Sequence, residues 1–419
     1  MPSFSFVHAA DLHLDSPFSA LGLQHPHLAD IMRSATFEAF ESIVQLCLDE
    51  GVDFLLVAGD VYDGEDRSLR AQVRFRDGLK RLSLAGIRSF VVHGNHDPLN
   101  GWSSQLEWPG EVHLFGDHAE IIEIRRGPAL LATVEGISYP AKEEKRNLSR
   151  LFKGNTGAFH IGLLHANLGS NTGHEPYAPC SLEDLMRAGI DYWALGHVHN
   201  QRILSDGHPW VCYPGNTQGR NIRETGERGC ILARVSETGE IDCDLRSTDV
   251  VRWATKDLSI TKMVTEEDLL KGIEKICRKT ALEASGRPVV LRLSLGGRGP
   301  LFGKLSSPHA LQDLTETARD IGMAFTPFIW IEQIKGAVNP LLDLEMRREE
   351  GSFLGELLRY SKELVHDPEL SSLLREELSP LFDDRRIRRF IESPSRDTLV
   401  RLLNEAEWVC AENLSERDE

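Results

Sequence analysis

Along the first part of the chain, short hydrophobic runs alternate with longer segments in which apolar residues recur at helical spacing. The runs predict buried strands at residues 4–8, 54–58, 89–93, 160–164, 192–195, 210–213 and 229–235. The longer segments predict helices near residues 31–48, 68–84 and 181–188. The β-α-β-α-β order at the start implies right-handed crossovers and a sheet that is at least partly parallel. Shorter runs at residues 112–115, 119–124 and 129–135 are typical of antiparallel strands.

The pattern changes after residue 250. Residues 255–340 predict a small α+β domain. Helices are expected near 266–280 and 308–322, strands near 288–295 and 325–333, and a glycine-rich turn at 296–299. Residues 341–419 become helical and charged, with helices expected at 351–365, 368–378 and 395–411. Apolar stripes on the first and last of these helices are more typical of packing within the protein than of a partner-binding face. We therefore expect an α/β fold: a two-sheet sandwich flanked by helices over residues 1–250, then the small domain and a helical C-terminal segment.

Composition is that of a soluble globular protein, with 41% hydrophobic and 26% charged residues. The chain lacks an apolar run of about 18 residues, the length of a membrane span, and it begins with a strand rather than the basic region of a signal peptide. The seven cysteines are scattered without a CxxC pair, so we expect them to be reduced and mostly buried. These features predict a cytoplasmic protein with no membrane partner.

The formal net charge of −17 argues mildly against a protein that binds nucleic acid alone, because phosphate neutralisation supplies most non-specific affinity. A basic stretch over residues 67–88 runs the other way, and Arg220 lies in a second basic group. Such stretches are as typical of a solvated face as of a phosphate-contacting one. We predict Arg67, Arg70 and Arg220 as substrate-binding residues, and DNA binding together with a partner stays open.

Polar motifs follow five of the predicted strands. They are Asp11-Leu12-His13, Gly59-Asp60, Gly94-Asn95-His96-Asp97, His165 and Gly196-His197-Val198-His199. Ligands of an open α/β sheet bind outside the carboxyl ends of its strands, so we expect these side chains on one rim. Any one histidine of this kind is more often structural. Five motifs in this order favour a metal site.

Seven side chains are predicted to bind two divalent cations: Asp11, His13, Asp60, Asn95, His165, His197 and His199. Two cations about 3.5–4 Å apart can stabilise the attacking and the leaving oxygen of a displacement at phosphorus, with a bridging hydroxide as nucleophile. Asp60 is the natural bridge, since a carboxylate has two oxygens. His197 and His199 could meet one ion or divide between two. Nitrogen and oxygen ligands without cysteine suit manganese, iron or zinc better than calcium, and manganese is our expectation.

Two residues of the third motif are predicted to act in catalysis without binding metal. His96 can donate a proton to the leaving oxygen or stabilise charge on the phosphoryl oxygens. Asp97 could hold His96 in the required tautomer.

The order of these motifs resembles the calcineurin-like metallophosphoesterase superfamily over residues 4–235. Four segments are further similar to bacterial YhaO-like and SbcD-like DNA repair exonucleases: residues 10–15 (ADLHLD), 59–63 (GDVYD), 67–71 (RSLRA) and 213–220 (YPGNTQGR). The resemblance implies one cation on Asp11, His13 and His199 and another on Asn95, His165 and His197. It also implies that Asp60 bridges them and that His96 is the catalytic histidine.

The resemblance implies partners and further domains as well. Residues 255–340 would form a capping domain, and residues 341–419 would bind an SMC-like coiled-coil ABC ATPase; a homodimer is also plausible on this ground. In one position the chain departs from the archaeal and eukaryotic relatives, which carry a second histidine where Asp63 stands. That departure leaves the predicted ligands intact, so it bears on exonuclease polarity and not on metal binding.

Three functions follow from these observations. The leading hypothesis is a metal-dependent phosphodiesterase that hydrolyses DNA, as a 3′→5′ exonuclease and conceivably an endonuclease, in DNA repair. The alternative is a phosphoesterase of small substrates such as nucleotides or cyclic nucleotides. A third is a scaffold or DNA-end sensor that keeps metals for structure, which the intact ligand set together with His96 disfavours.

Overall fold

The computed structural model describes residues 1–16, 26–64, 68–101, 106–154, 157–169, 178–305, 307–341, 344–366 and 395–415. Within these ranges, the first 250 residues build two six-stranded sheets. The first has the order β12 (Ile241–Ser247), β11 (Gly229–Val235), β1 (Phe4–Ala9), β2 (Phe54–Ala58), β3 (Arg88–Val92) and β4 (Val112–Leu114). The second has the order β5 (Glu120–Arg126), β6 (Ala129–Ile137), β7 (Phe159–His165), β8 (Tyr192–Gly196), β10 (Trp210–Tyr213) and β9 (Arg202–Asp206).

Strand directions agree with the predicted crossovers. Strands β1 to β4 are parallel neighbours, and β6, β7, β8 and β10 form a parallel series in the second sheet. The expectation of antiparallel strands after residue 111 is correct for β5 with β6 but wrong for β4, which pairs in parallel with β3. The physical reason is that β4 extends the first sheet, whereas β5 begins the second.

The central strands β1, β2 and β3 of the first sheet are buried on both faces, which explains why they form nearly continuous apolar runs. Phe4 and Phe6 face the core between the two sheets, where Phe6 stacks on Phe54 and meets the edge of Tyr192 with ring centroids 5.0 Å apart in each pair. Val7 and Ala9 of the same strand belong to the other core, under the helices. Alternate residues of β1 therefore serve two different cores.

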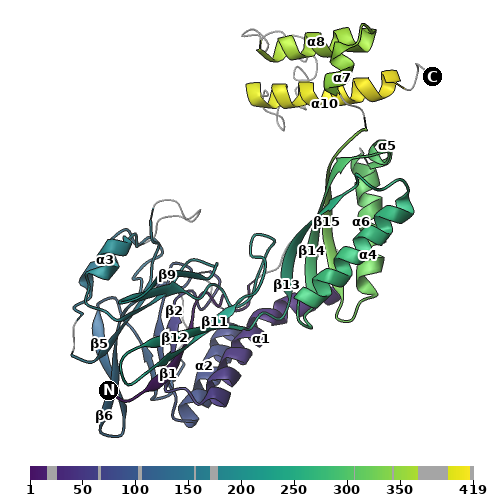
Figure 1. The fold of residues 1–419 in the computed structure, drawn as a ribbon. Helices are drawn as coiled ribbons and strands as arrows, with labels where there is room; N and C mark the ends of the chain where they lie inside the picture. Colours follow the sequence, from purple (N-terminus) through teal and green to yellow (C-terminus); the bar gives the residue numbers. More distant parts are fainter. Residues whose placement is uncertain are drawn as a thin grey trace. The chain divides into compact units, whose positions relative to one another are not determined.

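Two long helices cover the outer face of the first sheet (Figure 1). They are α1 (Pro26–Glu50) and α2 (Leu69–Leu84), and α2 begins at Ser68, whose hydroxyl accepts a hydrogen bond from the Ala71 backbone N–H. On the second sheet, the 3-10 turn η1 (Leu148–Leu151) and α3 (Leu182–Met186) pack on a core that includes Trp193 and Tyr213.

The rest of the chain holds a third sheet and further helices. They are β13 (Arg252–Ser259), α4 (Glu266–Glu283), β14 (Val289–Arg298), α5 (Phe302–Leu305), α6 (Pro308–Met323), β15 (Ile329–Asn339), α7 (Leu344–Glu349), α8 (Phe353–His366) and α10 (Arg396–Ser415). The third sheet has the order β13-β14-β15. The expected glycine-rich turn is wrong in part, because Gly296 and Gly297 continue β14. The helix predicted at 368–378 lies outside the described residues.

By compactness the chain divides into two units. One comprises residues 1–255, 277–292 and 322–332, and the other comprises 256–276, 293–321 and 333–419. The boundaries near residues 250 and 340 stay a prediction. None of the seven cysteines forms a disulfide, and five are buried, in line with the expected burial. Among the described residues, none of the helices has the length and apolar character that crossing a membrane requires.

Candidate metal centre

The predicted ligands lie at the carboxyl ends of strands from both sheets. Asp11 and His13 follow β1, and Asp60 follows β2. Asn95 follows β3 after Gly94, and His165 is the last residue of β7. His197 and His199 come after β8. The contacts described below bring all seven side chains into one group within unit 1.

Several of these residues have a left-handed backbone although they are not glycine. The φ angles are 52° at Asp11, 43° at His13, 50° at Asp60 and 106° at His197. Such a conformation costs about 1–3 kcal/mol per residue and is found mainly at functional sites. Backbone hydrogen bonds hold two of these loops together, from Asp11 N to Gly59 O (3.1 Å) and from His13 N to Asp60 O (3.0 Å). This backbone strain indicates that the conformation of these residues serves to place their side chains in the site.

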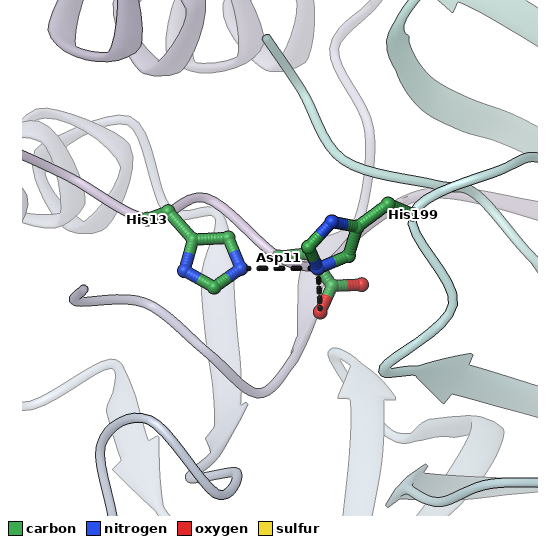
Figure 2. Close-up of side chains that lie close together, drawn as sticks. All are labelled: Asp11, His13 and His199. Atoms are coloured by element: carbon green, nitrogen blue, oxygen red, sulfur yellow. Dashed lines mark hydrogen bonds and ion pairs between the residues drawn. The ribbon is translucent and has the colours of Figure 1, made fainter. Parts of the chain in front are cut away.

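Asp11, His13 and His199 point toward one another (Figure 2). The Nε2 atoms of His13 and His199 are 3.2 Å apart, and His199 Nε2 lies 3.9 Å from Asp11 Oδ1. On its other side, His199 Nδ1 lies 2.7 Å from Glu224 Oε1, and His13 Nδ1 lies 3.3 Å from Asp63 Oδ1. The Glu224 carboxylate at Nδ1 of His199 favours the ring proton there, so that His199 Nε2 carries a lone pair directed toward Asp11 and His13.

Asn95, His165 and His197 form a second group. Asn95 Oδ1 lies 3.1 Å from His165 Nε2 and 3.1 Å from His197 Nδ1. His165 Nδ1 lies 2.9 Å from the carbonyl oxygen of Ala58 and must donate to it, since a carbonyl can only accept. His165 Nε2 is therefore a lone pair that faces the Asn95 oxygen.

Asp60 lies between the two groups. Its Oδ2 atom is 3.9 Å from His13 Nε2 and 3.5 Å from His165 Nε2, while Oδ1 accepts a hydrogen bond from the His96 backbone N–H at 2.9 Å. Burial raises the pKa of Asp60 to about 7, with a further contribution from the nearby charge of Asp97. Burial and the charge of Asp60 raise the pKa of Asp11 well above its usual value.

The histidines respond to the same burial in the opposite direction. Burial lowers the pKa of His165 to about 4, against the opposing effect of its hydrogen bond to Ala58. Burial and the charge of Arg220 hold the pKa of His13 well below its usual value. Both imidazoles are thus neutral near pH 7, which is the state in which a histidine binds a metal.

The donor set fits divalent cations. The Nε2 atoms of His13 and His199 face each other across 3.2 Å, and a lone pair of His165 faces the Asn95 oxygen. Facing acceptors repel, and a cation between them turns that repulsion into coordination. Imidazole nitrogens with carboxylate and amide oxygens are ligands of manganese, iron and zinc. The residues therefore match in type and direction what a bound cation requires.

Two glycines leave the space that this arrangement needs. A Cβ atom on Gly59, whose φ is +89°, would lie 2.5 Å from His165 Nδ1. A Cβ atom on Gly94 would overlap Asp60 Oδ1 and lie 2.8 Å from His165 Nε2. The glycines of the Gly-Asp and Gly-Asn-His-Asp motifs thus make room for ligand side chains.

The Asp97 carboxylate joins two loops of the site. Its carboxylate accepts hydrogen bonds from the backbone N–H groups of Gly94 (2.7 Å) and Val61 (2.8 Å), and it lies 3.2 Å from His93 Nδ1. These contacts join the loops after β2 and β3, and the catalytic role of Asp97 stays a prediction. The carboxylate beside the His96 ring is Asp63, with 3.4 Å between Oδ1 and Nδ1.

The three predicted substrate arginines differ in their surroundings. Arg67 lies outside the described residues. The Arg70 side chain is 56% exposed and lies 3.9 Å from Asp15, which leaves it accessible to a substrate. The Arg220 side chain is only 16% exposed and contacts Asp63 at 3.2 Å and Glu224 at 3.6 Å. Arg220 therefore contacts the carboxylates behind the ligand histidines.

Sequence reasoning did not identify Glu224. Burial would raise the pKa of this carboxyl, but the hydrogen bond from His199 and the charge of Arg220 outweigh it and hold the pKa well below its usual range. The same balance, with His13 in the place of His199, lowers the pKa of Asp63. Glu224 stands four residues after Arg220 in a loop without a recognisable motif, and its role appears only when the fold brings it to His199.

Comparison with known proteins agrees with this site. The calcineurin-like phosphoesterase model matches residues 4–201, and the model of the metallophosphoesterase YhaO middle domain matches residues 253–339. The uncharacterized metallophosphoesterase YhaO of Bacillus subtilis is 37% identical over 333 residues, which cover 79% of this chain and 81% of that protein. The chain belongs to the calcineurin-like metallophosphoesterase family. The resemblance and the two-sheet α/β fold predicted from the sequence are confirmed.

More distant relatives of this metallophosphoesterase are repair proteins. The DNA double-strand break repair protein Mre11 of Sulfurisphaera tokodaii is 28% identical over 210 residues, covering 49% of this chain and about half (51%) of that protein. The protein of the same name from Thermoplasma acidophilum is 26% identical over 293 residues, covering 67% of this chain and 74% of that protein. The chain thus belongs to a hydrolase family whose members bind divalent metals.

Proposed function

We propose that this metallophosphoesterase hydrolyses DNA phosphodiester bonds in DNA repair with two divalent cations, most suitably Mn²⁺. The observation that carries the proposal is the place of Asp60, whose Oδ2 atom faces His13 on one side and His165 on the other. A carboxylate in that position can serve two cations. The relatives that are named as double-strand break repair proteins support DNA as the substrate class.

The two groups of side chains would hold one cation each. Asp11, His13 and His199 would bind the first cation. Asn95, His165 and His197 would bind the second. Bound there, the cations would lower the pKa of a water and neutralise charge on the phosphoryl oxygens. The chain supplies the ligands and their directions, and Asp60 fixes how far apart the two groups lie.

His96 would act on the substrate. Its side chain is 40% exposed, unlike the buried ligands His13 and His165, so it can reach a bound phosphodiester. A protonated His96 would donate its proton to the leaving oxygen of the substrate or stabilise the phosphoryl oxygens. Asp63 lies on the Nδ1 side of the ring, with 3.4 Å between Oδ1 and Nδ1, and would help to orient it.

Polarity and partners complete the proposal. We propose 3′→5′ exonuclease activity, which can include endonuclease activity, and an SMC-like coiled-coil ABC ATPase as partner of residues 341–419. Homodimers and a cytoplasmic location belong to the same proposal. The net charge of −17 supports a need for a partner, because repulsion from DNA phosphates weakens binding by the chain alone.

The test is hydrolysis with Mn²⁺ of linear duplex and single-stranded DNA labelled at the 5′ or the 3′ end, beside bis-p-nitrophenyl phosphate. Wild type should shorten DNA from one end, and Asp60→Ala should remove hydrolysis of both substrates. Glu111→Ala, which changes an exposed carboxylate elsewhere in the same unit, is the matched control and should keep both activities.

Each outcome separates the alternatives. Hydrolysis of the small diester with intact DNA, even after the ATPase is added, would replace the nuclease with the phosphoesterase of small substrates. If Asp60→Ala kept both activities, the proposed role of Asp60 would be wrong. Absence of all hydrolysis by wild type, with metal bound, would favour the scaffold.

A further inference from the structure

Behind the ligand histidines, Asp63, Arg220 and Glu224 form a connected group of charges. Arg220 Nη1 lies 3.2 Å from Asp63 Oδ1, and Nη2 lies 3.6 Å from Glu224 Oε1. The Arg220 backbone N–H also donates to Glu224 Oε2 at 2.7 Å. All three side chains are largely buried, so solvent screens these charges less than it would on the surface.

The two carboxylates of this group lie beside the Nδ1 atoms of three imidazole rings. Glu224 Oε1 lies 2.7 Å from His199 Nδ1. Asp63 Oδ1 lies 3.3 Å from His13 Nδ1 and 3.4 Å from His96 Nδ1. Ser16 donates its hydroxyl to the other Asp63 oxygen at 2.7 Å, which fixes the orientation of that carboxylate.

Arg220 links the two carboxylates across the chain. Asp63 follows β2 and Glu224 lies in the loop before β11, so nothing in the local backbone sets the distance between them. A guanidinium has donors on separate nitrogens in a rigid plane and can contact both carboxylates at once, which a lysine ammonium does less well. Without the positive charge of Arg220, the buried carboxylates of Asp63 and Glu224 would be left unneutralised beside Asp11 and Asp60.

We infer that Asp63, Arg220 and Glu224 act as one positioning unit that directs His13 and His199 toward a single cation. Through Asp63 the same unit orients His96, so it couples a metal-binding pair to the residue proposed to meet the substrate. The inference rests on the proposed metal site. In the other ligand group, His165 is oriented by the backbone carbonyl of Ala58 instead.

That difference predicts a selective defect. Changes to the unit should weaken the cation held by His13 and His199 and leave the cation held with His165 in place. Removing a residue that orients a ligand histidine typically lowers metal affinity by about 10–100-fold. A residue that merely stabilises the fold would weaken both cations together.

The experiment is titration of the metal-free full-length chain with Mn²⁺, followed by calorimetry and by electron paramagnetic resonance of the bound ion. Wild type should bind two cations. Arg220→Ala and Glu224→Ala should each weaken one cation about 10–100-fold and leave the other unchanged. Glu224→Gln keeps an oxygen that can accept from His199, so its affinity for that cation should lie between those of Glu224→Ala and wild type. Arg220→Lys should bind that cation less tightly than wild type does.

Arg223→Ala is the matched control, because Arg223 is an exposed arginine in the same loop. It should bind two cations with wild-type affinity. Asp63→Asn should weaken the same single cation and also lower kcat for bis-p-nitrophenyl phosphate at saturating Mn²⁺, whereas Glu224→Ala at saturating Mn²⁺ should recover most of its kcat. Thermal melting of each variant checks that the fold is retained.

Equal weakening of both cations, or unchanged binding in Arg220→Ala and Glu224→Ala, would overturn the inference. Wild type that binds fewer than two cations would overturn the metal site on which the inference rests. Two cations in wild type with selective loss in the variants would support the positioning unit even where DNA is not hydrolysed, because neither readout uses DNA.

Discussion

At the scale of single residues, exposure separates His96 from the ligands. A ring that is 40% exposed can meet a substrate, and a buried ring such as His165 cannot. We expect His96→Ala to keep both cations and to lose about 10²–10⁴-fold in kcat, the usual contribution of a general acid. The loss should be larger for DNA than for bis-p-nitrophenyl phosphate, whose leaving group needs little protonation. Steady-state kinetics on the two substrates measure it.

The control for that variant is His118→Ala, since the His118 side chain is 75% exposed and pairs with Asp117 on the surface. It should retain wild-type kcat on both substrates. If His96→Ala hydrolysed both substrates at the wild-type rate, the assignment of His96 would be wrong.

The buried carboxyls make metal affinity depend on pH. With a pKa of about 7, raised by burial, Asp60 is mostly protonated at pH 6 in the metal-free protein and must lose its proton to bind a cation. The raised pKa of Asp11 acts in the same direction, whereas His165, with a pKa near 4, is already neutral. Affinity for Mn²⁺ should therefore rise from pH 6 to pH 8.

Calorimetry at pH 6, 7 and 8, in two buffers that differ in ionisation enthalpy, measures both the affinity and the protons released. Each released proton corresponds to about a tenfold gain per pH unit below the pKa. Affinity that stayed constant over this range would show that Asp60 and Asp11 are ionised before the metal binds.

The ligands could be predicted from the sequence because each motif directly follows a strand. Their partners could not. His199 is held by Glu224, His13 by Asp63 and His165 by the carbonyl of Ala58, and these contacts span 25, 50 and 107 positions of the chain. Only the folded chain brings such groups together, and the position of Asp63 beside the His96 ring was likewise not predicted from the sequence.

At the scale of elements, close packing at the carboxyl ends of the strands determines where the ligand side chains lie. Gly94 separates β3 from Asn95, and a Cβ atom there would overlap Asp60 and approach His165. We expect Gly94→Ala to displace these ligands and to weaken Mn²⁺ binding by at least about tenfold, with hydrolysis falling in parallel. Calorimetry and thermal melting measure the two effects.

Gly110→Ala is the matched control, since a Cβ atom on Gly110 meets nothing within 4 Å. It should bind Mn²⁺ as wild type does. Unchanged binding in Gly94→Ala would mean that the ligands move aside without cost, and the argument from close packing would fail.

Strands buried on both faces were predicted almost to the residue, as with β2 at Phe54–Ala58. Strands with exposed positions were not. The edge strands β9 (Arg202–Asp206) and β12 (Ile241–Ser247) have mixed polar sequences, because one face of each meets solvent, and no apolar run marks them. Direction also escaped prediction at β4, since a three-residue strand carries no signal of which sheet it will join.

At the scale of the whole molecule, the C-terminal helices carry apolar residues of two kinds. In α8, Leu354 is 6% exposed and packs in a cluster with Leu358 and Ala411, while the adjacent Phe353 is 71% exposed. Internal packing therefore accounts for Leu354 and Leu358, whereas the exposed Phe353 is accessible to the partner that we propose.

The exposed residues recur two helical turns apart. Tyr360 follows Phe353 by seven positions in α8, and Val409 follows Leu402 by seven in α10, and all four are exposed. Residues at this spacing share a helix face, as a helical partner requires. Under the proposed partnership, Tyr360→Ala with Val409→Ala should weaken binding of the SMC-like ATPase by at least about tenfold and leave kcat for bis-p-nitrophenyl phosphate unchanged.

Sedimentation or calorimetry with the cognate ATPase measures that affinity. Met186→Ala, which removes an equally exposed apolar side chain from α3, is the control and should bind the ATPase as wild type does. A loss of binding in the control alone would place the interface on the catalytic unit instead. Equal binding by all variants would exclude these helix faces as the contact, whereas a selective loss in the helix variants would show that partner binding and phosphodiester hydrolysis are separate properties of separate units.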